Sequence, residues 1–191
     1  MKTIHALPLL ALMALASGNV LASSPTDVTR QETRMPQSSR PAGIARTLVP
    51  ASPELVKQVV LDYGHYDRYI KPFEKSRVVG KSGDKTDVYL EVPILKGAAK
   101  IWVVLRMDPP KKVGDKEIIS ANMIKGNVKL MHANWKLKRT ADNNTELELE
   151  FLVVPSLPVP DSLLSSEAQH AAFKAVLGLQ GEALRRAGGA H

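Results

Sequence analysis

The feature that most constrains the fold is a change of hydrophobic period along the chain. Between Arg77 and Val154 apolar and polar residues alternate, as in β-strands that bury one face. From about Ser162 to Arg186 apolar residues recur at helical spacing instead. A chain with this pattern can bury one face of a sheet against a long helix, so we predict an α+β protein.

Turn-forming residues divide the alternating region into strands. Glycine, proline, aspartate and asparagine gather at intervals, and the segments between them predict strands near 77–81, 86–94, 99–108, 116–125, 128–139 and 145–154. A further strand is expected at 44–49. Since short loops join neighbouring strands, we expect an antiparallel sheet of about seven strands.

A helix is predicted between the first strand and the rest of the sheet. Ser52 can cap its first turn, Pro53 fits the first helical position, and Glu54 favours the positive end of the helix dipole. The helical spacing continues to Leu61. A second, short helix is expected at 66–70.

The last hairpin indicates which face of the sheet is buried. If Lys138 pairs with Glu146, then Lys136 meets Glu148, and opposite charges line one face. The other face then carries Trp135, Leu137, Leu147, Leu149 and Phe151. The same alternation turns inward Val88, Leu90, Val92, Ile94, Ile101, Val103, Leu105 and Met107. It places His132 with the lysines, on the face exposed to water.

Residues 1–22 have the layout of a secretory signal peptide. Lys2 precedes an apolar run over 4–16, and Val20 and Ala22 fit a cleavage site after Ala22. A membrane anchor is the alternative, but a spanning helix needs about 20 apolar residues and this run is shorter. We therefore expect cleavage near Ala22 and a periplasmic or secreted protein.

The segment 23–43 is polar and contains few branched or aromatic residues. Such a segment buries too little apolar area to offset the entropy lost on ordering. We predict that 23–43 is a flexible leader and that 44–187 forms the folded domain.

The absence of cysteine excludes disulfides and a thiol nucleophile. The histidines show no zinc-binding spacing either, because His65, His132 and His170 stand far apart. No Gly-x-Ser-x-Gly motif of a serine hydrolase occurs. We therefore predict a domain stabilised by core burial alone, without a metal ion or a cofactor.

The excess of basic residues bears on the partners of the protein. The net charge of +7 falls to +6 when Lys2 leaves with the signal peptide, and basic residues gather between Arg68 and Lys85. This charge either attracts the protein to an anionic membrane surface or forms a solvated face. Nucleic acid is not expected as a partner, because the chain has no motif of interleaved aromatic and basic residues.

The closing helix presents an apolar stripe of mostly small side chains. Its members are Leu164, Ala168, Ala171, Ala172, Ala175, Val176, Leu179 and Ala183. Alanines that face long strands leave volume unfilled unless bulky side chains of the sheet reach across. Either a hydrophobic pocket lies between helix and sheet, or Trp135, Phe151 and the methionines fill the space.

Three segments stand in a characteristic order along the chain. They are 49–54 with Val56, Val59 and Asp62 through Tyr69; Trp135 to Leu137 with Thr145, Leu147 and Leu149; and Pro155 through Pro160 before the closing helix. With this order the chain, over about 44–184, resembles the SRPBCC superfamily of START lipid-binding domains, polyketide cyclase-like proteins and coenzyme Q-binding proteins. The resemblance implies a helix-grip fold, in which a curved antiparallel sheet wraps around a long C-terminal helix and encloses a hydrophobic cavity.

The resemblance also implies a function, namely binding or carriage of a small hydrophobic ligand such as a lipid or quinone. Methionine suits such a cavity because its side chain is flexible and polarizable. The residues expected to line it are Tyr66, Ile70, Phe73, Ile94, Met107, Met123, Met131, Trp135, Phe151, Leu164, Ala168, Ala175 and Leu179.

Two other functions stay open at this point. A polyketide cyclase-like enzyme would need inward polar groups for acid and base chemistry, and the candidates for this role are Asp62, Arg106 and Asn122. A protein-interaction module would instead use the apolar groove to accept a segment of a partner protein. Neither alternative requires a different fold.

Overall fold

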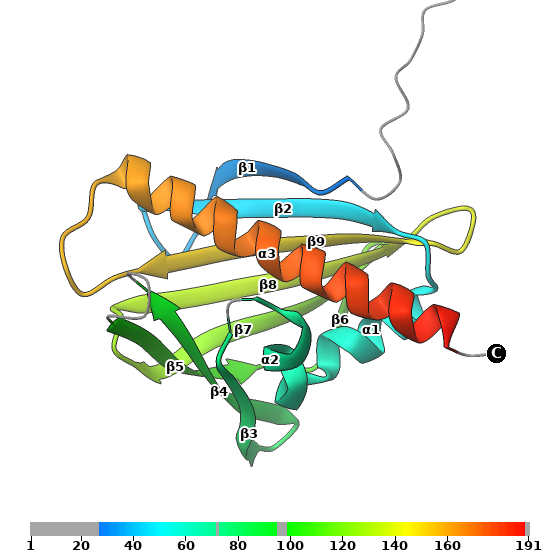
Figure 1. The fold of residues 1–191 in the computed structure, drawn as a ribbon, viewed down its shortest axis with the longest axis horizontal. Helices are drawn as coiled ribbons and strands as arrows, with labels where there is room; N and C mark the ends of the chain where they lie inside the picture. The colour runs from blue at the N-terminus through cyan, green and yellow to red at the C-terminus, as the bar shows by residue number, and fades with distance from the viewer. Residues whose placement is uncertain (1–26, 72, 95–98, 190–191) are drawn as a thin grey trace, which may run out of the picture.

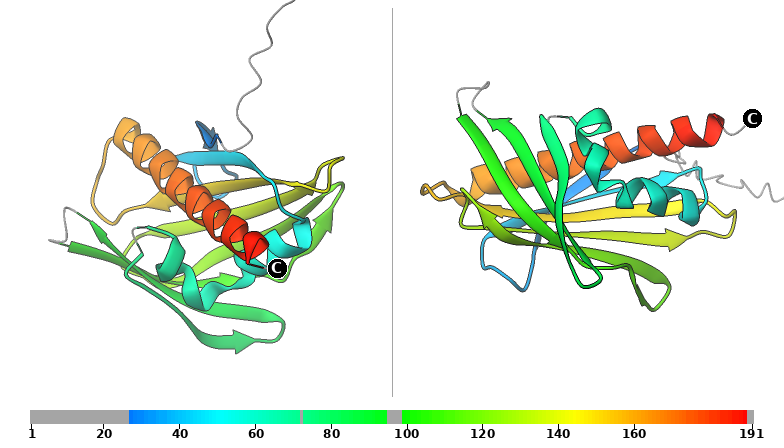
Figure 2. Two further views of the ribbon diagram at one scale, coloured as in Figure 1. Left: turned by 45° about the vertical axis from the view of Figure 1, so that its right-hand side comes forward. Right: turned by 90° about the horizontal axis from the view of Figure 1, so that it is seen from below.

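The computed structural model describes residues 27–71, 73–94 and 99–189, and the predicted signal peptide, 1–22, lies outside them. The described residues form one antiparallel sheet of nine strands, in the order β1-β2-β9-β8-β7-β5-β4-β3 with β6 paired to β7. The sheet is curved, and neighbouring strands follow one another in the chain except where β2 meets β9 and where β7 meets β5, with β6 between them in the chain (Figures 1 and 2). The strands are β1 Thr29–Arg34, β2 Pro41–Val49, β3 Lys75–Ser82, β4 Lys85–Ile94, β5 Ala99–Met107, β6 Lys111–Val113, β7 Lys116–Gly126, β8 Leu130–Arg139 and β9 Thr145–Val154.

The long helix α3, Asp161–Gly188, lies across one face of the sheet, and α1 and α2 lie beside its C-terminal half (Figure 1). The elements between β2 and β3 are α1, Pro53–Leu61, the 3₁₀ turn η1, Tyr63–His65, and α2, Tyr66–Tyr69. Ser52 caps α1 as predicted, because its hydroxyl accepts a hydrogen bond from the Leu55 N–H at 3.4 Å. The buried side of α1 consists of Val56, Val59 and Val60.

The register of the last hairpin agrees with the prediction from charge. Lys138 pairs with Glu146 and Lys136 with Glu148. Trp135, Leu137, Leu147 and Leu149 are therefore buried on the face that α3 covers, which we call the inner face. On β5 the predicted choice also holds, since Val103, Leu105 and Met107 are buried while Trp102 points to the outer face.

The prediction that 23–43 is a flexible leader is wrong for residues 29–43. Residues 29–34 form strand β1, which pairs along its whole length with β2, and β2 begins at Pro41. Two contacts also tie β1 to α3: the Arg30 guanidinium lies 5.6 Å from the Phe173 ring, and the Ser165 hydroxyl donates to the Glu32 carboxylate. Backbone pairing and these contacts order a segment whose own side chains bury little apolar area.

The outer face carries a small second core that the alternation did not predict. The connection from β1 to β2 places Met35 over Ala42 and Leu152. His132, which we expected to face water, is only 4% exposed there. Its Nδ1 lies 2.8 Å from the Asn122 side-chain oxygen, and burial lowers its pKa from the ordinary value. The face of the sheet on which His132 lies was predicted correctly, but the β1–β2 connection covers this part of the outer face.

Two glycines allow α3 to approach its neighbours closely. A Cβ on Gly43 of β2 would lie 2.4 Å from the Ala168 carbonyl carbon, and one on Gly178 of α3 would lie 2.3 Å from the Tyr69 carbonyl oxygen. Both neighbours are backbone atoms, which cannot move aside as a flexible side chain can. The helix is therefore fixed between β2 on one side and the end of α2 on the other.

A buried carboxylate on the outer face joins three strands. Glu91 of β4 accepts a hydrogen bond from the Tyr89 hydroxyl at 2.7 Å and ion pairs from Lys75 and Lys100, each at 3.1 Å. The hydrogen bond from Tyr89 and those from the two lysines lower the pKa of Glu91 to about 2.

We expect Glu91→Gln to lower the free energy of unfolding at neutral pH. A carboxylate whose pKa is lower in the folded state stabilises the protein above its unfolded pKa, and this contribution is lost as the pH falls from about 4.5 to about 2. The difference in the free energy of unfolding between wild type and variant, measured by urea unfolding, should therefore be largest at pH 7 and vanish toward pH 2. Glu167→Gln is the control, because this exposed carboxylate forms no ion pair with the described residues. An equal, pH-independent change in both variants would contradict the role of Glu91.

Candidate ligand-binding groove

The structure brings most of the predicted ligand-binding residues together between the inner face and the helices. One continuous hydrophobic cluster contains Tyr66, Ile70, Met107, Met131, Trp135, Ala175 and Leu179, with Phe73, Met123 and Phe151 partly buried against it. Leu164 and Ala168 are buried as well, but in the N-terminal half of α3 and outside this cluster. Ile94 is the last residue of β4, and its side chain lies outside the described part of the structure.

Burial is uneven along the groove. At the end beside α1, side chains such as Val49, Val56 and Val59 are completely buried. At the opposite end, where β9 leads into α3, four inward side chains are only partly buried although they pack against the core, whereas Met131, which pairs with Val153, is buried. We call these residues the groove mouth: Ile101, Met123, Phe151 and Val153. In this half α3 carries the small residues Ala171 and Ala175. Apolar surface is thus accessible at one end of the inner face.

Aromatic residues form the wall of the groove on the α2 side. Tyr66 stands edge-on to Tyr63 at 6.0 Å and to Tyr69 at 5.9 Å, and it stacks with Phe73 at 6.4 Å between ring centroids. The Tyr66 hydroxyl donates to the Val60 carbonyl, and burial raises the pKa of Tyr66 well above its ordinary value. The hydroxyl therefore stays protonated, and the wall is rigid and apolar toward the groove.

The polar groups of the inner face are occupied by structural hydrogen bonds. Ser76 donates to the Tyr63 carbonyl and Thr145 to the Ala51 carbonyl, the latter at 2.8 Å. The Gln180 amide donates to the Thr47 hydroxyl at 2.9 Å. These bonds satisfy the buried hydroxyls, so the described inner face offers a ligand mainly apolar contact.

The three candidate catalytic residues also have structural partners. Arg106 binds Asp87 through two hydrogen bonds of 2.8 and 2.9 Å on the outer face. Asp62, at the end of α1, accepts from Arg186 and lies 2.5 Å from the His65 ring nitrogen. Asn122 bonds to His132 on the outer face. Among the described residues, no group of three His, Asp or Glu side chains could hold a metal ion.

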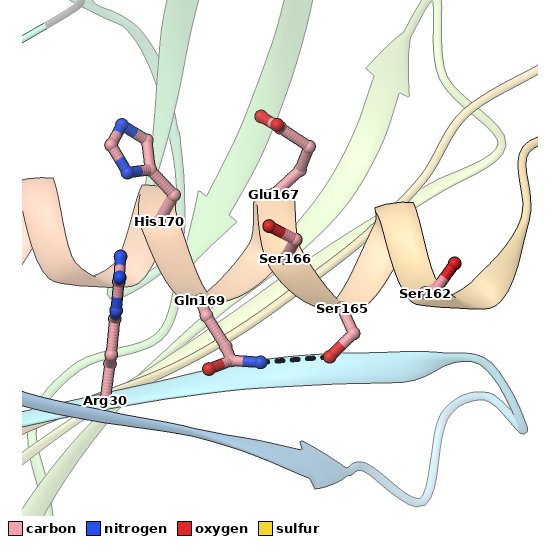
Figure 3. A pocket seen from close by; sticks show the side chains of 7 residues that line it. All are labelled: Arg30, Ser162, Ser165, Ser166, Glu167, Gln169 and His170. Atoms are coloured by element: carbon pink, nitrogen blue, oxygen red, sulfur yellow. Dashed lines mark hydrogen bonds between the residues drawn. The ribbon is translucent and has the colours of Figure 1, made fainter.

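Two of the hollows that described residues line lie outside the groove. One of about 560 Å³ lies between β1 and α3 and is lined by polar side chains; within it Gln169 donates to Ser165 at 3.0 Å (Figure 3). The other, of about 540 Å³, lies around Pro109 and Pro110 after β5. The groove is therefore defined by its partly buried apolar side chains and not by either of these hollows.

No helix in the described part of the chain is long and apolar enough to span a membrane.

A long C-terminal helix across the inner face of a curved antiparallel sheet defines the helix-grip class of proteins. The model of one family, described as polyketide cyclase/dehydrase and lipid transport, matches residues 49–177. The chain belongs to this family, and through it to the SRPBCC superfamily. A search of curated protein sequences finds no match.

Solved structures share the fold at low sequence identity. A STAR-related lipid transfer protein from Xanthomonas axonopodis has a TM-score of 0.71 at 13% identity, over 85% of this chain and 97% of that one. The human StAR-related lipid transfer protein 5 has a TM-score of 0.69 at 12% identity, over 84% and 83%. The Zhui aromatase/cyclase from Streptomyces sp. R1128 has a TM-score of 0.57 at 20% identity, over 84% and 96%. At these identities the likeness establishes the fold alone.

Proposed function

We propose that this protein binds and carries a hydrophobic molecule, such as a lipid or a quinone, in the groove between its sheet and α3. The observation that carries the proposal is the groove mouth, where inward apolar side chains of three strands stay partly accessible opposite the alanines of α3. The family description includes lipid transport, and two of the similar structures are lipid transfer proteins, which supports an apolar cargo.

Burial of a hydrophobic ligand in such a groove would give useful affinity. A ligand that loses about 400 Å² of apolar surface gains roughly 10 kcal/mol before the costs of association are subtracted. Because the inner hydroxyls already have backbone partners, the ligand needs no polar group deep in the groove. A polar head would stay at the mouth, in contact with water.

Export forms the second part of the proposal. Residues 1–22 have the charge, apolar run and cleavage site of a signal peptide, which supports delivery to the periplasm or beyond. A hydrophobic molecule in that aqueous space needs a protein to shield it. Mass spectrometry of the mature protein, isolated from its native host, should find an N-terminus near residue 23.

The two tryptophans provide a test of the binding site. Trp135 is buried on the inner face, whereas Trp102 stacks on Tyr89 on the outer face, with ring centroids 6.4 Å apart. We expect a brominated fatty acid or quinone to quench the fluorescence of Trp102→Phe, which keeps Trp135, several-fold more than that of Trp135→Phe. Equal quenching of the two variants, or none, would contradict binding in the groove.

Experiments on the purified protein also distinguish carriage of a ligand from the two alternative functions. Native mass spectrometry followed by solvent extraction should recover a bound lipid or quinone in about equimolar amount. A polyketide cyclase-like enzyme would instead convert an added polyketide chain, and a protein-interaction module would retain a partner protein with the groove unoccupied. Either of those results without a bound ligand would replace the carrier proposal.

A further inference from the structure

The three segments that surround the groove mouth are joined by one residue, Asn127, in the turn between β7 and β8. Its side-chain oxygen accepts from the Trp102 N–H at 2.9 Å, and its amide donates to the Lys100 carbonyl at 2.8 Å. Its own carbonyl accepts from the Ser156 hydroxyl at 3.0 Å. The start of β5, the β7–β8 turn and the loop from β9 to α3 therefore form one continuous surface at this end of the sheet.

This surface exposes large apolar side chains to solvent. Leu157 in the β9–α3 loop is 76% exposed, Leu163 in the first turn of α3 is 50% exposed, and Ile124 at the end of β7 is 47% exposed. Nothing in the fold of the described residues covers them. Exposed apolar side chains at the entrance of an apolar groove indicate a surface that binds a membrane or another molecule.

The charge of the same surface is positive. The segments 124–129 and 155–160 contain Lys125 and Lys129 and no acidic residue. Neither lysine forms an ion pair with a described residue, and the Lys125 ammonium lies 6.0 Å from the centre of the Trp102 ring. Lys125, beside Trp102, and Lys129 are therefore both available to an anionic partner at this end of the sheet.

We propose that this surface, the docking rim of Ile124, Lys125, Lys129, Leu157 and Leu163, binds the headgroup region of an anionic lipid bilayer. Leucine and isoleucine side chains can enter the acyl boundary while the two lysines contact lipid phosphates. Trp102, with its ring beside a lysine, has the amphipathic character that favours the interface. The inference rests on the proposed function, because docking in this position holds the groove mouth against the membrane that supplies or receives the ligand.

Vesicle co-sedimentation tests the rim directly. Full-length mature protein is mixed with vesicles of phosphatidylcholine and phosphatidylglycerol, and with phosphatidylcholine alone. We expect binding to the anionic vesicles that weakens about tenfold or more in Lys125→Glu/Lys129→Glu and in Leu157→Ser/Leu163→Ser. Pure phosphatidylcholine should bind weakly. The emission of Trp102 in Trp135→Phe should shift to the blue on binding.

Matched controls lie on β6, at the far end of the sheet. Lys111→Glu/Lys112→Glu changes the net charge by the same amount, and Val113→Ser removes an apolar side chain that is 50% exposed. Both should keep vesicle binding within twofold of wild type. Loss of binding in these controls equal to that of the rim variants would overturn the proposal in favour of non-specific charge attraction, as would a wild type that binds no vesicles.

The amount of extracted ligand separates this proposal from the proposed function. Rim variants should retain their ligand, because the groove residues are unchanged, while losing the ability to exchange it with vesicles. A wild-type protein that docks on vesicles but yields no ligand would refute carriage and leave the docking rim standing. A protein that carries ligand and exchanges it equally well in all rim variants would refute the rim alone.

Discussion

Replacing Gly178 with alanine is expected to lower the free energy of unfolding by about 2 kcal/mol or more. The added methyl group would lie 2.3 Å from the Tyr69 carbonyl oxygen and 3.0 Å from the Ile70 Cα, so either α2 or α3 has to move. Alanine favours a helix interior over glycine, but this gain of about 1 kcal/mol is smaller than the cost of overpacking against backbone. Urea unfolding followed by circular dichroism measures the difference.

Gly181 gives the matched control, three residues further along α3. A Cβ at Gly181 meets no atom within 4 Å, so Gly181→Ala should raise the free energy of unfolding by about 0.5–1 kcal/mol through helix propensity alone. The two substitutions are chemically identical, but their expected effects on the free energy of unfolding are opposite in sign. If Gly178→Ala proved as stable as Gly181→Ala, the close approach of α2 to α3 would be wrong.

Ala175→Phe is expected to remove the bound ligand while the protein stays folded. Ala175 belongs to α3 and to the hydrophobic cluster of the groove, and the phenyl ring would take the volume that we assign to the ligand. We expect the amount of ligand extracted per protein to fall at least about tenfold, the equivalent of about 1.4 kcal/mol. The loss of stability should stay below about 1.5 kcal/mol, as for a side chain that fits available space.

Ala183→Phe is the corresponding control, two turns further along the same helix. Ala183 is completely buried in the sealed part of the core, so a phenyl ring there should destabilise the protein by about 3 kcal/mol or prevent folding. If Ala175→Phe destabilised the protein as much as Ala183→Phe, the inner face opposite Ala175 would be filled by side chains. The carrier proposal would then lose its site.

The local pattern of the sequence predicted the sheet well where the register or the direction of a side chain depends on a single neighbouring strand. Charge pairing set the register of Lys136 and Lys138 against β9, and alternation turned Val103 and Trp135 inward. A shift by one residue would have buried these charges, so the pattern admits only one register. Capping by Ser52 is equally local, because it involves only residues of one helical turn.

The candidate site was predicted less completely, for a physical reason. The sequence indicates which side chains face inward, and the predicted ligand-binding residues include Met123 and Phe151. It does not show how completely each of these side chains is covered. Ile101 and Val153, which also belong to the groove mouth, were not among the predicted ligand-binding residues, although Ile101 was predicted to face inward and Val153 alternates with Phe151 and Leu149. Partial exposure arises from where α3 crosses the sheet, which depends on contacts between distant segments.

The amino-acid sequence by itself determined the α+β class, the antiparallel order of neighbouring strands, the inner face and the long closing helix, because periodicity and short turns act over a few residues. Only the tertiary structure decided that β1 joins the sheet, that the β1–β2 connection buries His132, and that Gly43 and Gly178 let α3 lie close to its neighbours. It also placed three exposed apolar side chains around one end of the groove, together with two lysines that form no ion pair with a described residue. These features depend on which distant segments pack together, and the energy of that packing is not expressed in any local pattern of residues.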